Sequence, residues 1–295
     1  MARHRRRSVG LAVSAAVLIL ALSGSTAWAT FPGANGRIAY GRTPSGGPYT
    51  IHSVVPSGRD DKRLGPGSMP SWSPNGHRLA FIRSVNGQGE VYSMAADGTD
   101  ARRLTHTRIN EDSPTWSPSG RRIAFDGHSG ITVMRSDGSD QRVLTDRGGS
   151  PTYSPDGKWI AFLVGRTAKR NASIWVMRRN GHHQHRLLSL GSDGGWIGDY
   201  SPDASKISFS RCGAECRYFV ANSNGGDIRR LPCPPDYFRG LTAPSFSPDG
   251  RRLLGETAAV EVVTLPLESC SPRVVAHLGP DDGALPDWQP LPGGG

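Results

Sequence analysis

The sequence predicts an all-β fold, a six-bladed β-propeller built from four-stranded antiparallel blades. The first observation is a recurring twelve-residue motif, which reads PSWSPNGHRLAF, PTWSPSGRRIAF, PTYSPDGKWIAF, PSFSPDGRRLLG and, in a weaker copy, GDYSPDASKISF. The second is spacing: the motif aromatics follow one another at intervals of 37 to 47 residues, the length of one propeller blade. The third is a split copy. NGRIAY at 35–40 is the second half of the motif and PDWQP at 286–290 is the first half, so one blade shared by the two ends closes the ring.

Each motif predicts a hairpin. Ser-Pro-Asp-Gly has the residues of a type I turn, with Pro presetting φ at the second position and Gly at the fourth. The segment after it, KWIAF at 158–162, is apolar on both alternating faces, which indicates a strand covered on both sides. The aromatic residue before the turn belongs to the preceding strand. A hairpin of this size cannot bury both faces alone, so we expect stacked sheets.

A second hairpin lies between successive motif copies. Its turns are Asp97-Gly98, Asp137-Gly138 and Asn180-Gly181, each between two alternating segments. Asp-Gly and Asn-Gly are strong signals for two-residue hairpin loops. Each unit therefore contains four strands.

Residues 1–29 are expected to be a signal peptide. Four arginines precede an apolar stretch at 9–22, and Ala27-Trp28-Ala29 provides a small-residue cleavage site before Thr30. The alternative is a membrane anchor, but the apolar stretch is shorter than the roughly 20 residues of a span. We expect a propeller domain over 30–295 that is secreted or periplasmic, in the cell envelope, without a stable membrane span.

The basic residues recur at two places in each unit. They follow the Ser-Pro turn, as Arg121 and Arg122 do, or precede the last strand, as Arg102 and Arg103 do. The formal net charge of +10 falls to +6 without the four arginines of the N-terminal segment. We interpret this dispersed charge as solvated strand edges that discourage aggregation, in preference to an anion-binding patch. No nucleic-acid partner is expected.

All four cysteines lie in the last third of the chain, and an even number in an exported protein predicts disulfides. Cys212 and Cys216 flank a hairpin tip and are expected to pair, which leaves Cys233 and Cys270 to join neighbouring repeats. A zinc site using all four is the alternative, although its spacing is poor.

The repeat PTYSPDGKWIAF, followed by an Ile-x-Val-Met strand and an Asp-Gly turn, resembles the WD-repeat-like blades of TolB-type β-propellers. The resemblance extends over roughly residues 31–290 and implies the propeller alone, without the additional α/β domain that precedes the propeller in TolB. It implies the fold and says little about activity.

Two motif copies depart from the pattern. Ala204 stands where the other copies have glycine, and we expect its turn to relax away from positive φ. Gly255 stands in place of phenylalanine, in a unit that also lacks the Asp-Gly turn. The cysteines fall in these two units, so we expect the disulfides to compensate for weaker repeats.

The ligand site is expected on the face opposite the two conserved turn types, where the loops vary. Residues near the axis on that face are the candidate ligand-binding residues: Glu111, Asp112, Trp196, Asp199, Tyr237, Arg239, Asp281 and Asp282. The alternative is structural, with the acids capping strand ends and the aromatics covering the rim of the core. The mixed acidic and aromatic lining suits a peptide segment, a sugar or a cation.

No catalytic motif is found: a Gly-x-Ser-x-Gly elbow, a His-Glu-x-x-His pair and a phosphate loop are all missing from the sequence. The sequence therefore predicts a non-enzymatic, monomeric binding module for a protein or glycan of the cell envelope, with no cofactor and no metal site. The alternative is a lyase or hydrolase acting on polysaccharide. It requires His106, His128 or His277 to meet a carboxylate at the channel.

Overall fold

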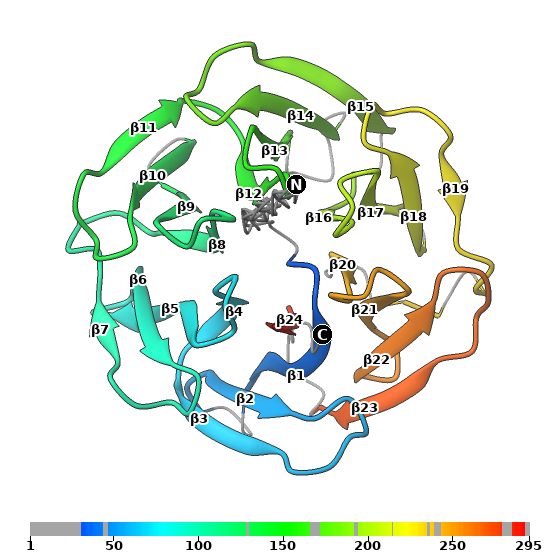
Figure 1. Ribbon diagram of the computed structural model, residues 1–295, viewed down its shortest axis with the longest axis horizontal. Helices are drawn as coiled ribbons and strands as arrows, with labels where there is room; N and C mark the ends of the chain where they lie inside the picture. Colours follow the sequence, from blue (N-terminus) through cyan, green and yellow to red (C-terminus); the bar gives the residue numbers. More distant parts are fainter. Residues whose placement is uncertain are drawn as a thin grey trace, which may run out of the picture.

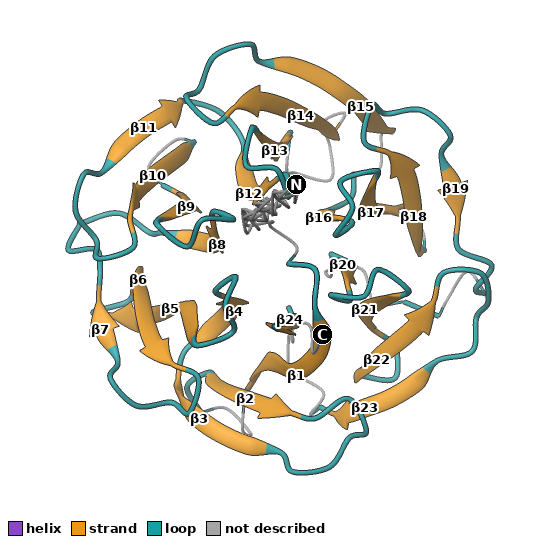
Figure 2. Ribbon diagram, viewed as in Figure 1, coloured by secondary structure: helices purple, strands orange, loops and turns teal. Residues whose placement is uncertain are grey.

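The computed structural model describes residues 31–292, apart from 44–46, 128–129, 166–171, 192–193, 214, 235–236, 239–242 and 279–284. Every regular element in the described part of the chain is a β-strand (Figure 2). The strands form six four-stranded antiparallel sheets arranged as blades around a central axis (Figure 1). The predicted six-bladed propeller is confirmed. The described residues contain no helix capable of crossing a bilayer.

Blades one to three occupy the first half of the described chain and the closing strand at its end. Blade one contains β24 (Asp287–Leu291), β1 (Ala34–Arg42), β2 (Thr50–Val54) and β3 (Lys62–Pro66), from the axis outward. Blade two contains β4 (Ser68–Trp72), β5 (Arg78–Val85), β6 (Gln88–Ala95) and β7 (Arg102–Arg103). Blade three contains β8 (Asp112–Trp116), β9 (Arg122–Asp126), β10 (Ile131–Arg135) and β11 (Arg142–Thr145).

Blades four to six complete the ring in the same order. Blade four contains β12 (Gly149–Tyr153), β13 (Trp159–Val164), β14 (Ala172–Arg178) and β15 (His185–Gly191). Blade five contains β16 (Ile197–Tyr200), β17 (Lys206–Cys212), β18 (Cys216–Asn222) and β19 (Arg229–Arg230). Blade six contains β20 (Ser245–Phe246), β21 (Arg252–Glu256), β22 (Glu261–Pro266) and β23 (Arg273–His277).

The ring closes by pairing the two ends of the described chain, as the split motif predicts. β24 lies beside β1 near the axis (Figure 1), and Trp288 is the register partner of Ile38. The buried Trp288 ring also donates a hydrogen bond from Nε1 to the carbonyl oxygen of Gly36 at 3.2 Å. The last strand thus completes the first blade.

The hydrophobic core lies between neighbouring blades. In one cluster, Ala80 and Ile82 of blade two pack with Trp116 and Phe125 of blade three. Trp116 also donates from its indole nitrogen to the carbonyl oxygen of Ser71 in the preceding blade, at 3.2 Å. Trp116 therefore fastens blade three to blade two through burial and one directional bond.

The Ser-Pro turns have the predicted geometry. In blade four, Gly157 N donates to Ser154 O at 2.8 Å, and Gly157 has a φ of 65°. The Ser154 hydroxyl donates to Asp156 at 2.6 Å and accepts from the Trp159 amide at 2.9 Å. The serine and the aspartate of the motif are therefore turn residues.

The expected relaxation at Ala204 is wrong. Ala204 has a φ of 59° and donates from its amide to Ser201 O at 2.8 Å, as the glycine does in the other turns. The Ser201 hydroxyl still bonds Asp203 at 2.5 Å and the Lys206 amide at 2.9 Å, so the turn is held in its usual shape. The alanine accepts the steric cost of a left-handed conformation.

Replacing Ala204 with glycine is therefore expected to raise the free energy of unfolding by about 0.5–1 kcal/mol, because relief of the left-handed strain exceeds the entropy gained by the unfolded chain. Urea denaturation measures the change. The matched control is Gly157→Ala, which is expected to destabilise because a Cβ there would lie 3.2 Å from Pro118 Cγ in a left-handed residue. An Ala204→Gly protein no more stable than the parent would contradict this account.

The packing of a neighbouring aromatic ring explains why position 255 is a glycine. A Cβ at Gly255 would lie 2.4 Å from Cε2 of Tyr218, a buried residue of blade five. The Tyr218 ring stacks on Phe238 with centroids 3.8 Å apart, and its hydroxyl accepts from the Glu256 amide at 3.3 Å. An aromatic ring supplied by the neighbouring blade thus occupies the space that the motif phenylalanine would need.

The disulfides have the expected pairing. Cys212–Cys216 closes the hairpin between β17 and β18, at a sequence separation of 4. Cys233–Cys270, at a separation of 37, joins the segment leading into blade six to the outer hairpin of that blade. Both bonds lie in the part of the ring with irregular repeats.

Candidate functional site

The innermost strands present one polar side chain each toward the central channel. These residues precede the motif aromatic, and they are Ser71, Thr115, Thr152, Asp199, Ser245 and Asp287. Side chains alternate along a strand, so the aromatic enters the core between blades while its neighbour faces the axis. The variable position of the Pro-x-aromatic motif is therefore the channel-lining position.

A pocket of about 330 Å³ lies where the innermost strands begin. These strands begin at the crossings from the preceding blades, so the pocket opens on the predicted variable face. Its rim includes four prolines of the motif, at positions 70, 114, 151 and 286, together with Trp196. We call it the channel pocket.

The backbone at the rim is unusual. Met69, Ser113, Ser150 and Leu285 each precede a motif proline, and each has a positive φ, between 34° and 51°. The strand register shifts at this point in blades two, three and four, as it does at a β-bulge. Bulges re-aim the following side chains. The rim is thus set by the same backbone feature in several blades.

Asp199 is held by hydroxyl groups from both neighbouring blades. Thr152 Oγ1 of blade four donates to Oδ1 at 3.0 Å, and Ser245 Oγ of blade six donates to Oδ2 at 2.6 Å. Burial raises the pKa of the Asp199 carboxyl, although both hydroxyls act in the opposite direction.

Asp287 is held by backbone amides. Its Oδ2 accepts from the Trp72 amide at 2.6 Å and its Oδ1 accepts from the Trp288 amide at 2.9 Å. Burial and the negative charge of Asp199 raise the pKa of Asp287 to about 7, against the effect of the two amides. Asp287 therefore titrates near neutral pH under the influence of the Asp199 charge.

Three of the predicted residues line the channel pocket: Asp112, Trp196 and Asp199. Tyr237 lies elsewhere, because its ring packs edge-on against Phe238 at 5.0 Å in a cluster between blades five and six. Arg239, Asp281 and Asp282 lie outside the described residues.

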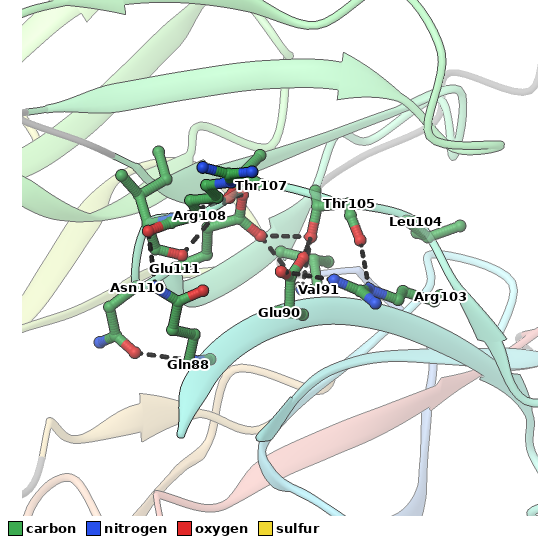
Figure 3. Close-up of polar contacts among 12 residues, drawn as sticks. Gln88, Glu90, Val91, Arg103, Leu104, Thr105, Thr107, Arg108, Asn110 and Glu111 are labelled. Carbon is green, nitrogen blue, oxygen red and sulfur yellow. Dashed lines mark hydrogen bonds and ion pairs between the residues drawn. The ribbon is translucent and has the colours of Figure 1, made fainter. Parts of the chain in front are cut away.

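Glu111 does not line the channel pocket; it is buried in a polar network of blade two and the following crossing (Figure 3). Thr107 Oγ1 donates to its Oε1 at 2.9 Å, and Thr105 Oγ1 is bonded to its Oε2. Thr105 also bonds Glu90, which forms an ion pair with Arg103 at 2.6 Å. Burial raises the pKa of Glu111, with a smaller contribution from Glu90. The network holds the crossing in place.

Asp287 is not among the site residues predicted from the sequence, although it lies in the half-motif that predicts the closing strand. The signal that could have found it is its position directly before the aromatic, equivalent to Asp199. The two carboxyl groups line the same pocket because blades five and one contribute them from equivalent positions of the motif.

The candidate histidines do not converge in the described part of the chain. His106 is exposed, and His277 lies on the outer strand β23, where its Nδ1 is 3.2 Å from Glu261. His128 lies outside the described residues. A search of the described residues for three or more His, Cys, Asp or Glu side chains able to hold a metal finds none.

Fold and site together define a six-bladed β-propeller with a carboxylate pair in its central channel. No protein-family model matches the sequence. The chain is 28% identical over 237 residues to the uncharacterized protein Atu1656 of Agrobacterium fabrum, a match covering 72% of this chain and 66% of that protein. It is 33% identical over 113 residues to a TolB homolog of Chlorobium luteolum, a match covering 37% of this chain and 26% of that protein. The matched regions thus span less than two thirds of either relative.

Solved structures show the same fold. TolB from Acinetobacter baumannii superposes with a TM-score of 0.72 at 22% identity, covering 86% of this chain and 67% of that one. An oligogalacturonate lyase in complex with manganese superposes with a TM-score of 0.51 at 13% identity, covering 83% and 74% of the two chains, a likeness of fold alone. The chain therefore has the six-bladed propeller fold that is also found in TolB.

Proposed function

We propose that this protein is an exported binding module that engages a protein or glycan of the cell envelope through the channel pocket. The observation that carries the proposal is the carboxylate pair of Asp199 and Asp287 inside a pocket with a proline-rich rim. A rigid, concave site with a few convergent polar groups is the usual form of a recognition site. Residues 1–29 act in this proposal as the export signal.

The carboxylate pair favours a ligand that places a cationic group in the channel. A lysine or arginine side chain, a peptide amino terminus or an amino sugar has this chemistry. Hydroxyl groups of Ser71, Thr115 and Ser245 supply further hydrogen-bonding partners around it. Trp196 at the rim offers a ring face to a sugar or to an aliphatic chain.

The charge of the pair predicts a pH dependence. As the pH rises through about 7, Asp287 loses its proton and the negative charge of the pair increases. The affinity for a cationic ligand is therefore expected to rise between pH 6 and pH 8. The measurement is retention of envelope components on the immobilised full chain at both pH values, followed by titration of the retained species.

The variant that tests this assignment is Asp199→Asn. Its amide can keep the hydroxyl groups of Thr152 and Ser245 as partners, and loss of the negative charge lets the pKa of Asp287 fall. We expect weaker retention at pH 8 and little change in retention between pH 6 and pH 8. His277→Ala, on an exposed outer strand, is the control. Equal pH dependence in the parent and in Asp199→Asn would reject the carboxylate pair as the binding site.

A polysaccharide lyase or hydrolase is a second candidate, which the raised pKa of Asp287 beside Asp199 favours. Paired carboxyls with unequal pKa values are a common source of general acid and base catalysis. Assays for new reducing ends and for unsaturated products on acidic and neutral polysaccharides distinguish it. If the parent protein forms product and Asp199→Asn does not, the protein is an enzyme and the binding-module proposal is wrong.

A further inference from the structure

A second cavity lies on the opposite face of the ring, between blades three and four. Its volume is about 910 Å³, and its walls are the Ser-Pro turns of the two blades, including residues 117–120 and 156–157. The start of β9, the end of β10 and the start of β11 complete one side. We call it the turn-face groove. It shares no lining residue with the channel pocket.

The turn-face groove is strongly basic. Five arginines line it, against two aspartates: Arg121, Arg122, Arg135, Arg142 and Arg179, with Asp137 and Asp156. Both aspartates have local partners. Asp137 accepts from the amide and hydroxyl of Ser139, and Asp156 from the Ser154 hydroxyl and the Lys158 amide.

Most of the arginine charge is uncompensated. Asp140 pairs with Arg122 at 2.8 Å and lies 3.8 Å from Arg135. Nη1 of Arg122 is buried and has no hydrogen-bond partner among the described residues. Arg121, Arg142 and Arg179 are exposed and form no ion pair with any residue that the structure describes.

The arrangement is specific to blade three. Arg122 and Arg135 are direct cross-strand partners, and Arg142 pairs with Val133 in the same register. With Arg121, which precedes Arg122, these residues define four positions that are all arginine in blade three. In blade two the equivalent positions are His77, Arg78, Ala95 and Arg102. In blade four they are Lys158, Trp159, Arg178 and His185. In blade five they are Ser205, Lys206, Asn222 and Arg229. Blade six has three arginines, with Pro266 in place of the fourth: Arg251, Arg252, Pro266 and Arg273. Like charges directly opposite destabilise a sheet, so the repeat alone does not account for this cluster.

Arginines of blades three and four act electrostatically on one shared residue of the groove, Tyr153. The floor includes the buried ring of Tyr153 from blade four. Burial raises the pKa of its hydroxyl, while the positive charges of Arg122, Arg142 and Arg179 act to lower it. Arginines from two blades therefore direct their charge to a common site.

We propose that the turn-face groove binds an acidic glycan whose carboxylate or phosphate groups pair with Arg142, Arg179 and Arg121. Guanidinium groups bind such anions through strong, paired hydrogen bonds. The remaining lining consists of serine, glycine, asparagine and aspartate, with one proline and one tyrosine. These groups bond sugar hydroxyls, whereas a peptide would find no aliphatic pocket for its apolar side chains.

The test is calorimetric titration of the full chain with three probes of similar length: an oligogalacturonate, a neutral oligoglucan and an oligoglutamate. We expect the oligogalacturonate to bind most tightly, with an affinity that falls as salt is added. Arg142→Ala and Arg179→Ala are each expected to weaken binding about tenfold or more. Both side chains are exposed and form no ion pair with the residues that the structure describes, so the variants are expected to fold.

Arg229→Ala is the matched control. Arg229 occupies the position in blade five that is equivalent to Arg142 in blade three, and it forms an ion pair with Asp227 at 3.0 Å. The substitution removes one positive charge outside the turn-face groove. Its affinity is expected to stay within about twofold of the parent. Asp199→Asn is expected to leave oligogalacturonate binding unchanged, which separates this proposal from the channel pocket. Undetectable binding, equal binding of the neutral oligomer, tighter binding of oligoglutamate, or full affinity in Arg142→Ala would each overturn it.

Discussion

Replacing Trp288 with alanine is expected to destabilise the protein by about 3–5 kcal/mol, the cost of removing a large buried aromatic side chain. Trp288 is 4% exposed and packs with Ile38, Tyr40 and Leu254, so it joins the last strand to blades one and six. It also donates the indole hydrogen bond to Gly36. The truncation leaves a cavity at the point where the ring closes.

Urea denaturation measures the loss of stability, and hydrogen exchange locates it. The amides of β1 and β24 are expected to lose protection before those of blades three and four. The matched control is Trp159→Ala in blade four, since that ring is only half-buried and stacks beneath Arg178 at 4.4 Å. If Trp288→Ala cost no more than Trp159→Ala, the closing strand would have no special role in stability.

Removing the Cys233–Cys270 disulfide by a double alanine substitution is expected to cost about 3–4 kcal/mol. The bond closes a loop with a sequence separation of 37, so its loss frees a long segment in the unfolded chain. Cys233 is also buried among Tyr218, Phe238 and Val263. This connection holds the irregular blade six to the segment that leads into it.

The control is the double substitution at Cys212 and Cys216, whose separation is only 4. The loop-entropy relation predicts a smaller effect there, about 2 kcal/mol. Chemical denaturation without reductant compares the two. Hydrogen exchange under reducing conditions tests whether blades five and six are the sensitive part, as compensation for weaker repeats requires. Uniform exchange across the ring, or equal costs for the two pairs, would count against that role.

The sequence was a good guide wherever a feature repeats or is local. The motif spacing predicted the blades, the split copy predicted the pairing of β24 with β1, and a hairpin tip predicted Cys212–Cys216. Ala204 shows the limit of local reasoning. Its residue type favours a relaxed turn, but the hydrogen bonds of Ser201 and Asp203 keep the left-handed conformation.

The candidate site was predictable only in part, because side-chain direction depends on register. Glu111 and Asp112 are neighbours in sequence, yet Glu111 enters the buried network with Thr105 and Asp112 lines the channel pocket. The register shift between Asp112 and Thr115 decides which residues turn inward. A bulge at this position cannot be read from residue types.

The sequence by itself determined the ring: how many blades it has, which ends close it, and which residues make its turns. These features follow from short-range chemistry repeated along the chain. The tertiary structure alone decided which charges meet. The charge of Asp199 raises the pKa of Asp287, which comes from another blade, and Arg142 and Arg179 line one groove. The members of each pair come from different blades, and only the packing of the blades around the axis brings them within range of each other's fields.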